Sequence, residues 1–355
     1  MSYTNGLDDP SAFFQCTLYT GDGSNDLSIT NSGNSDLQPD WVWIKQRDSR
    51  DHFLFDSVRG VLQYVASNTD AAESTLSDGL KSFNSNGFTI DDGVGINQNN
   101  DPHVSWNWKA GTSFTNDASS TGIGTIDSTG SVNTDAGFSI VSYTGNQTSG
   151  ATVAHGLGSK PAMMIFKERN GTTGWVVYHH KNTSAPATEY LQLNSSNATG
   201  DYAGYFNDTE PTSSVFTLGN DTGINQSGDT YIAYCFAEKQ GYSKFGSYTG
   251  NGNADGTFVY TGFKPALIIF KNADSGSADW VLYDNKRDGF NSNNIALYPN
   301  ANAADDTGND PDILSNGFKQ RATGSDRNGN GENIIYMAFA ENPFVTSTGV
   351  PATAR

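Results

Sequence analysis

SYTGN, at residues 142–146, recurs without change at residues 247–251. A looser form of the same stretch, LYTGDG, lies near the N-terminus at residues 18–23. Internal repeats of this kind indicate a duplicated structural unit. In each copy a tyrosine precedes a Thr-Gly pair, and glycine enters a turn at low steric cost. We therefore expect Tyr19, Tyr143 and Tyr248 to end the first strand of a repeated unit, and we do not expect the stretch to be a binding site.

A second motif follows each copy of this turn and consists of a proline, an apolar run and a lysine. It is PDWVWIK at residues 39–45, PAMMIFK at 161–167 and PALIIFK at 265–271. A proline at the first position of a strand removes no ladder hydrogen bond. The run after it is continuously apolar, which is typical of a strand buried on both faces. One face must then be covered by a neighbouring unit or by another protomer. We expect the closing lysines to keep their charge in solvent at the rim of the core.

Two more patterns repeat in the same order along the chain. An aromatic strand occurs at residues 52–57, 175–180 and 280–285, and a closing strand occurs at 101–110, 229–238 and 332–341. Within the aromatic strand, alternation places Trp175 and Val177 on one face and Val176 and Tyr178 on the other. The sequence therefore predicts an all-β protein of three tandem, antiparallel, jelly-roll-like β-sandwich repeats of about 100 residues each.

The boundaries of the predicted units follow from where these patterns begin and end. Repeat 1 covers residues 1–110, repeat 2 covers 138–241, repeat 3 covers 242–342, and a C-terminal tail covers 343–355. Residues 111–137 are rich in Gly, Ser and Thr, so we expect an extended or flexible linker there. Repeats 2 and 3 have almost no spacer, and we expect them to pack together.

The bulk composition narrows the class of partner. Aromatic residues are 12% of the chain, which argues against disorder, and charged residues are only 16%. The net charge of −18 disfavours binding to nucleic acid or to an anionic membrane. No apolar run is long enough for membrane insertion, and the N-terminus has no pattern of a secretory signal. Two cysteines, Cys16 and Cys235, are expected to be free and buried.

The side chains needed for catalysis do not form a recognisable motif. The chain has five histidines but no G-x-S-x-G nucleophile elbow. The HGLG stretch at residues 155–158 superficially resembles an oxyanion-hole loop, but the other units have ordinary loop residues there. His179 and His180 end a strand, and we expect both to face solvent. Many carboxylate pairs could exist among 38 acidic residues, and none stands out as a glycosidase pair. The sequence predicts no enzyme activity, no catalytic, cofactor-binding or metal-ligating residue, and no cofactor.

One loop resembles part of a calcium site. The residues from Asp326 to Glu332 fit the first half of the D-x-[DN]-x-[DN]-G pattern. The twelfth position is Met337, which cannot supply the bidentate carboxylate, and no flanking helices are expected. A hairpin turn is the simpler expectation, and calcium binding by this loop stays open.

Longer stretches of the chain resemble a family of repeat proteins from the virions of marine tailed phages. The stretches are SVRG at residues 57–60, GFSIVSYTGN at 137–146, VAHGLGSKP at 153–161, YIAYCFAE at 231–238 and LSNGFKQR at 314–321. Members of the family are described as tail-fibre, receptor-binding or structural proteins, and the resemblance covers nearly the whole chain. It implies a non-enzymatic structural protein on the exterior of the virion, of tail-fibre or receptor-binding type, with other tail or capsid proteins as partners.

Two alternatives remain beside this expectation. The sequence has no heptad shaft or collagen-like tract, which leaves a head decoration (cement) protein that stabilises the capsid as one alternative. A polysaccharide-binding module or a depolymerase is the other. The receptor-binding hypothesis itself predicts a homo-oligomer, namely a trimer, exposed aromatic residues on loops at one end, and a host-surface glycan as ligand.

Overall fold

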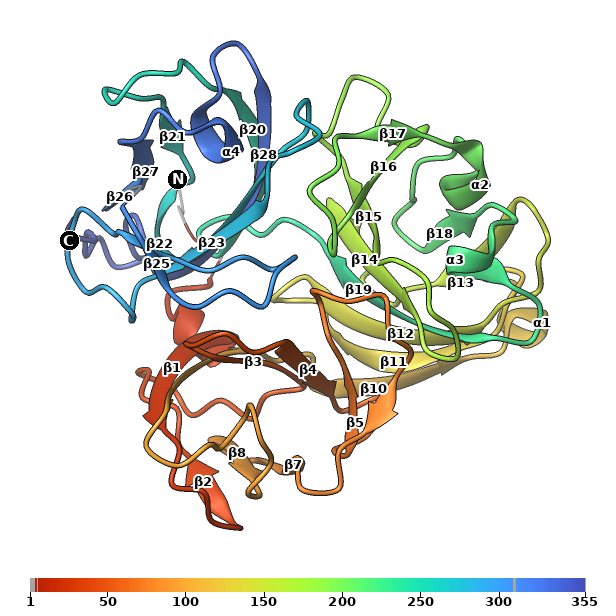
Figure 1. The fold of residues 1–355 in the computed structure, drawn as a ribbon. Coiled ribbons are helices and arrows are strands. Elements are labelled where there is room, and N and C mark those ends of the chain that lie inside the picture. Colours follow the sequence, from red (N-terminus) through yellow and green to blue (C-terminus); the bar gives the residue numbers. More distant parts are fainter. Residues whose placement is uncertain (1–3, 5, 309–310, 355) are drawn as a thin grey trace.

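The computed structural model describes residues 4, 6–308 and 311–354 and consists mostly of antiparallel β-sheets. Over the described residues, strands make up 41% and helices 5%. This confirms the predicted all-β fold class. The sheets gather into three lobes arranged in a ring, which we number in chain order (Figure 1). In Figure 1 lobe 1 is red to orange, lobe 2 is yellow to green, and lobe 3 is mostly blue.

Lobe 1 contains a short 3-10 helix and nine strands: η1 (Pro10–Ala12), β1 (Phe14–Thr20), β2 (Leu27–Ile29), β3 (Trp41–Gln46), β4 (His52–Asp56), β5 (Gln63–Val65), β6 (Ser74–Thr75), β7 (Leu80–Asn84), β8 (Gly87–Ile90) and β9 (Pro102–Trp108).

Lobe 2 contains ten strands and three short helices: β10 (Thr112–Asn116), α1 (Ala118–Thr121), β11 (Ser128–Asn133), β12 (Phe138–Thr144), β13 (Ala151–Ala154), β14 (Met163–Glu168), β15 (Val176–His179), β16 (Glu189–Gln192), β17 (Gly200–Asp201), α2 (Ala203–Phe206), β18 (Val215–Leu218), α3 (Thr222–Asn225) and β19 (Thr230–Phe236).

Lobe 3 contains the remaining described elements: β20 (Ser243–Thr249), β21 (Phe258–Tyr260), β22 (Phe263–Asn272), β23 (Trp280–Asp284), β24 (Ile295–Ala296), β25 (Asp306–Thr307), β26 (Pro311–Leu314), β27 (Gly317–Gln320), α4 (Ser325–Asn328) and β28 (Asn333–Pro343).

The same strand order recurs in the three lobes. Each lobe has a main sheet, ordered β1-β9-β3-β4 in lobe 1, β12-β19-β14-β15 in lobe 2 and β20-β28-β22-β23 in lobe 3. Each also has a smaller sheet, β2-β8-β7, β13-β18 and β21-β27-β26, which lies toward the outside of the ring (Figure 1). In each lobe the first strand of the main sheet pairs with the closing strand: β1 with β9, β12 with β19 and β20 with β28. The next strand along the chain belongs to the smaller sheet and pairs there with a late strand: β2 with β8, β13 with β18 and β21 with β27. This wrapped pairing is the arrangement expected of a jelly-roll-like sandwich.

The apolar strands β3, β14 and β22 are buried on both faces, as their sequences predict. In β3, Trp41 and Trp43 point into a core shared by all three lobes, whereas Val42 and Ile44 point into the core of lobe 1 itself. The same alternation holds in β14 and β22. The second face of each strand is therefore covered by the other lobes of the same chain. Pro265 does not begin its strand but lies at a bulge within β22.

Aromatic rings from every lobe form this shared core. All six tryptophans belong to it. The ring centroid of Phe339 lies 5.6 Å from that of Trp108 and 5.9 Å from that of Phe236, and these three residues occupy equivalent positions in the closing strands. Trp41 of lobe 1 stacks on Tyr234 of lobe 2 at 4.4 Å. The three lobes therefore fold around one common centre, which explains why each lobe is apolar on two sides.

The expectation of a linker at residues 111–137 is wrong. Strands β10 and β11 pair with each other, and β11 pairs with β12, so the segment extends the main sheet of lobe 2. Small residues allow this close packing: a Cβ on Gly130 would lie 2.1 Å from the carbonyl oxygen of Ile140. The Asp117 carboxylate caps α1 between the two strands by accepting from the Ser120 N–H. A composition typical of linkers here serves a tightly packed hairpin.

Cys16 and Cys235 are free and buried, as predicted. Within the residues that the structure describes, no helix is long and apolar enough to cross a bilayer.

Candidate functional site

The repeated SYTGN turns hold each lobe together from within. The hydroxyl groups of Tyr19 and Tyr143 donate to the carbonyl oxygens of Ile96 and Ile224, both at 2.7 Å. Tyr248 donates to a carbonyl of lobe 3 in the same way. The glycine of the turn passes so near another chain segment that a Cβ on Gly145 would lie 2.3 Å from a carbonyl oxygen. The turn is a structural clamp, and glycine is required there by close approach.

The three lysines that close the apolar strands are buried, and the expectation that they keep their charge in solvent is wrong. Burial lowers the pKa of each ammonium group to about 8. Lys167 donates to the carbonyl of Thr173 in its own lobe at 2.8 Å and to that of Asp70 in lobe 1 at 3.1 Å. Lys271 reaches the carbonyl of Ser196 in lobe 2 at 2.9 Å. A neighbouring lobe covers the strand end, which a sequence pattern alone does not reveal. The three buried lysines described in this paragraph are Lys45, Lys167 and Lys271.

The histidines also belong to the framework. His179 is buried and His180 is half-buried, so the expectation that both face solvent is wrong. Lobe 3 covers them, because His179 Nε2 lies 3.2 Å from the carbonyl of Tyr336 and His180 Nε2 lies 2.7 Å from that of Phe245. Burial lowers the pKa of His179 to about 3. His155 of the HGLG stretch is buried and accepts from the N–H of its own loop, at Leu157.

The loop from Asp326 to Glu332 forms α4 and a turn in place of the expected hairpin. Its oxygen atoms serve separate contacts. Asp326 accepts from the Asp279 N–H at 3.2 Å, and Glu332 accepts from the side chain of Asn272 at 2.6 Å. Burial raises the pKa of Asp326. Across the described residues no group of three or more His, Cys, Asp or Glu side chains is placed to hold a metal ion.

Three equivalent contacts close the ring of lobes. In each contact a backbone N–H of one lobe donates to a carbonyl of the next. The pairs are Glu73 to Arg169 at 2.9 Å, Thr199 to Ala273 at 2.9 Å and Asp305 to Arg47 at 2.8 Å. A ring nitrogen on the aromatic strand also reaches a neighbouring carbonyl. These pairs are Trp175 to Ala66 at 2.9 Å, Trp280 to Gln192 at 2.9 Å and His52 to Tyr298 at 3.0 Å. We call them contacts 1/2, 2/3 and 3/1.

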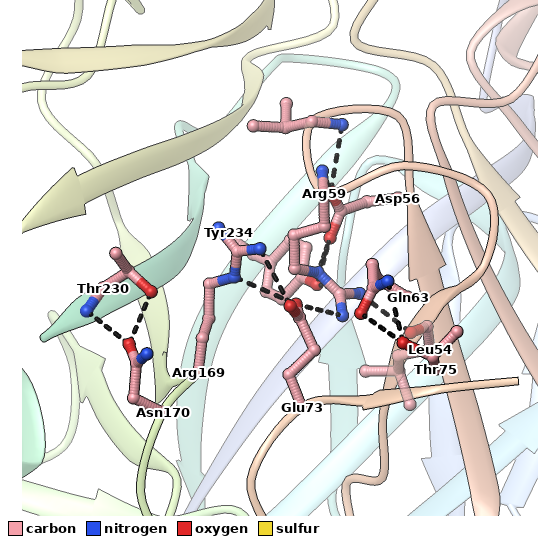
Figure 2. A network of polar contacts seen from close by, with 11 residues as sticks. Leu54, Asp56, Arg59, Gln63, Glu73, Thr75, Arg169, Asn170, Thr230 and Tyr234 are labelled. Carbon is pink, nitrogen blue, oxygen red and sulfur yellow. Dashed lines mark hydrogen bonds and ion pairs between the residues drawn. The ribbon is translucent and has the colours of Figure 1, made fainter.

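Contact 1/2 surrounds a buried network of charges (Figure 2). Arg59 pairs with Asp56, and neither side chain is accessible to solvent. Glu73 lies between two guanidinium groups, 3.3 Å from that of Arg59 and 2.8 Å from that of Arg169 in lobe 2. The Tyr234 hydroxyl of lobe 2 donates to Asp56 at 2.8 Å. Burial raises the pKa of Tyr234, which keeps this phenol a neutral donor.

Contact 3/1 repeats the network with different side chains. Arg287 pairs with the buried Asp284 and also donates to Asp305 at 3.0 Å. Arg47 of lobe 1 donates to Asp305 at 2.6 Å, and the Trp106 indole donates to Asp284 at 3.2 Å. Burial alone would raise the pKa of Asp284, but the Arg287 guanidinium holds it below its usual range.

Contact 2/3 has neutral residues at all of these positions. His179 and Asn182 stand where the other contacts have the Asp–Arg pair, and Thr199 stands in place of the carboxylate. Ala273 and Met337 replace the second arginine and the aromatic donor. The Thr199 hydroxyl donates to Asn182 at 2.8 Å. The lobe contacts therefore share a backbone frame but differ in charge.

The most exposed aromatic cluster on lobe 2 consists of Tyr190, Tyr202 and Tyr205. Tyr190 belongs to β16, Tyr205 belongs to α2, and Tyr202 precedes α2. Ring centroids lie 4.7 Å apart for Tyr190 and Tyr205, 5.1 Å for Tyr202 and Tyr205, and 6.5 Å for Tyr190 and Tyr202. The planes are close to perpendicular, as edge-to-face aromatic packing prefers. Tyr202 is 45% exposed, and the other two rings are half-buried.

Glycines and a carboxylate fix these rings. A Cβ on Gly200 would lie 2.7 Å from the Tyr190 ring, and a Cβ on Gly204 would lie 2.4 Å from the Tyr202 ring. The Tyr202 hydroxyl donates to Asp221 at 3.0 Å, and this hydrogen bond raises the pKa of the phenol. The cluster is therefore a preformed surface with both aromatic and carboxylate groups.

No motif shared between the repeats marks this cluster. Its signal is the segment TGDYAGYF at residues 199–206, which departs from the other repeats. The hydrogen-bonded register places Leu76 of lobe 1 and Gly308 of lobe 3 where lobe 2 has Tyr202. A difference between repeats, and not a shared motif, marks the surface feature.

Comparison with known proteins places the whole ring in one family. A family model described as a domain of unknown function (DUF7483) matches residues 9–343. Searches of the curated proteins and of the solved structures find no match. The matched region includes all three lobes and the β10–β11 hairpin as a single domain. The chain belongs to the DUF7483 family, a domain family of unknown function.

Proposed function

We propose that this protein is a non-enzymatic structural protein on the exterior of a bacteriophage virion, of tail-fibre or receptor-binding type. The resemblance to virion proteins of tailed phages supports its place on a particle. The single observation that carries the binding role is the exposed cluster of Tyr190, Tyr202 and Tyr205. Rigid tyrosines supply a large contact area at low entropic cost, which is typical of recognition surfaces.

The buried polar side chains support a role in holding surface residues in place for a partner rather than a role in catalysis. The buried arginines, carboxylates and histidines described above are engaged in contacts between lobes or within loops. A ring closed around a common core is a rigid body on which surface residues keep fixed positions. The net charge of −18 favours solubility before assembly.

The partners in this proposal are other tail or capsid proteins and a glycan on the host surface. A homotrimer is part of the proposal as well. Its mass is measured by light scattering coupled to size-exclusion chromatography, and a monomer in solution would remove the trimer from the proposal without affecting the position on the particle.

Purified virions test the proposal directly. Particles are purified from an infection in which the chain is expressed, and its copies per particle are counted by quantitative mass spectrometry. A small number of copies supports the tail-fibre or receptor-binding type. Hundreds of copies would favour the alternative of a head decoration protein, and absence from the particles would contradict the proposal.

A further inference from the structure

Within the tyrosine cluster, Tyr190 and Tyr205 pack against the apolar core of lobe 2, whereas Tyr202 does not belong to that core. In lobes 1 and 3 the position of Tyr202 is taken by Leu76 and Gly308, although the surrounding strand pairing is the same. Helix α2 also has no counterpart there, since β7 follows β6 and β26 follows β25 among the described elements. The lobes therefore form without a ring at the position of Tyr202, and the exposure of this ring needs another explanation.

The arrangement of the rings fits a flat ligand with C–H groups on its face. The face of an aromatic ring carries negative charge and its edge positive charge, so a ring attracts polarised C–H groups. Tyr202 presents its ring at 45% exposure, and Tyr205 supports it edge to face at 5.1 Å. Because Gly204 and Asp221 fix the ring of Tyr202, little side-chain freedom is lost on binding.

The polar groups beside the rings select for hydroxyl donors. Asp221 accepts from the Gly223 N–H and from Tyr202, and each carboxylate oxygen has a second lone pair for a further donor. Asp201, the next residue before Tyr202, is exposed. Carboxylates at this surface and a net charge of −18 repel anionic ligands. A ligand with C–H faces, many hydroxyl groups and no negative charge is a neutral saccharide.

We propose that Tyr190, Tyr202 and Tyr205 form a binding site for a neutral saccharide, with Tyr202 as the stacking platform and Asp221 as an acceptor for sugar hydroxyl groups. The site gives the receptor-binding role proposed above its ligand class, and it rests on that role for its biological meaning. Binding itself is a property of the isolated protein and is tested without virions.

The experiment uses the purified full-length chain and two sets of probes. The neutral set contains oligosaccharides of glucose, mannose and galactose, and the acidic set contains oligogalacturonate and sialylated glycans. Binding is screened on an array and then measured by saturation-transfer NMR and calorimetry. We expect binding to members of the neutral set only. No binding to either set, or stronger binding to the acidic set, overturns the proposal.

Matched variants test whether these tyrosines form the saccharide site. Tyr202→Ala is expected to weaken binding by about tenfold or more, whereas Tyr202→Phe keeps the ring and most of the affinity. Tyr260→Ala is the control, because Tyr260 is an exposed tyrosine on lobe 3, 53% accessible, and its loss should leave binding unchanged. Tyr190→Ala, on the adjacent strand, is the second test if Tyr202→Ala fails to fold. Unchanged binding in the folded variants overturns the site.

The outcomes separate this inference from the proposed function. If the chain is present on virions but binds no saccharide, the saccharide site is wrong and the virion role stands. If the chain binds a neutral saccharide through Tyr202 but is absent from virions, the site stands and the virion role is wrong.

Discussion

Contacts 1/2 and 2/3 have the same backbone hydrogen bonds, but the side chains are charged in contact 1/2 and neutral in contact 2/3. Both contain an N–H to carbonyl bond of 2.9 Å and an indole that donates to a neighbouring carbonyl, also at 2.9 Å. Contact 1/2 adds two arginines and two carboxylates, whereas contact 2/3 has only neutral side chains at the equivalent positions. The shared apolar core and the backbone hydrogen bonds therefore close the ring at both contacts, and the charges are a local addition at contact 1/2.

A buried group of charges destabilises the fold when one of its members is removed. A buried ion pair contributes little net stability compared with apolar residues of similar volume, but a buried charge without its partner is strongly destabilising. Contact 1/2 should therefore be far more sensitive to single substitutions than contact 2/3. Substitutions at equivalent positions of the two contacts test this asymmetry.

Arg59→Leu should have the largest effect. The substitution leaves the Asp56 carboxylate buried without its cation, and we expect the free energy of unfolding to fall by about 3–5 kcal/mol. Urea unfolding is followed by the fluorescence of the buried tryptophans. The matched control is Asn182→Leu at contact 2/3, which strands no charge and should cost about 1–3 kcal/mol. Equal losses in the two variants would contradict the asymmetry.

Tyr234→Phe removes one hydrogen bond to the buried carboxylate of Asp56. We expect a loss of roughly 1.5–3 kcal/mol, since hydrogen bonds to charged groups are stronger than neutral ones. Met337 occupies the equivalent position in contact 2/3, and Met337→Leu should cost less than about 1.5 kcal/mol because it conserves volume. The urea midpoints of the two variants are compared with that of the wild type. A larger loss in Met337→Leu would rule out a special role for the phenol.

Acid should weaken contact 2/3 through His179. Its folded pKa of about 3 lies below the ordinary value of 6.5, so the unfolded chain binds the proton first as the pH falls. The stability contributed by the neutral imidazole is complete above pH 6.5 and is lost as the pH falls toward 3. By pH 5 this loss is about 2 kcal/mol.

The variant His179→Gln isolates this effect, because glutamine can still donate to the Tyr336 carbonyl but does not titrate. Other buried histidines titrate in the same range, so wild type and variant are compared at each pH. The wild type should lose more stability between about pH 7 and about pH 5 than the variant does. Parallel pH profiles would show that His179 has no such role.

The smallest effect is expected from transferring a charge pair into contact 2/3. The double variant Thr199→Glu with Ala273→Arg recreates there the pair that Glu73 and Arg169 form at contact 1/2. We expect a gain of no more than about 1 kcal/mol, since the original pair is partly exposed and such pairs contribute little, and since Ala273 is itself buried. Thr199→Glu alone is the control and should be destabilising. A gain of several kcal/mol would mean that the charges, and not the core, close the ring.

Local side-chain patterns along the chain were enough to predict the all-β class and the repetition of the fold. Alternation in the aromatic strands and the continuous apolar runs at residues 41–44, 163–166 and 267–270 predicted strands and the burial of both of their faces. These features depend on local side-chain periodicity, which a sequence displays directly. The repeated Tyr-Thr-Gly turn was also correctly interpreted as a structural element of each unit.

Tertiary structure alone decided which surfaces those faces meet. Tyr234 and Asp56 are 178 positions apart, and nothing near either residue in the sequence indicates their hydrogen bond. The same reason explains the burial of Lys167 and His179 and the folding of residues 111–137 as a hairpin. For Lys167 and His179 another lobe supplies the hydrogen-bond partner, and for residues 111–137 the neighbouring strand β12 supplies it. The tyrosine cluster was also not predicted, because its rings come from β16, from α2 and from the residue before α2, and they meet only when the chain folds.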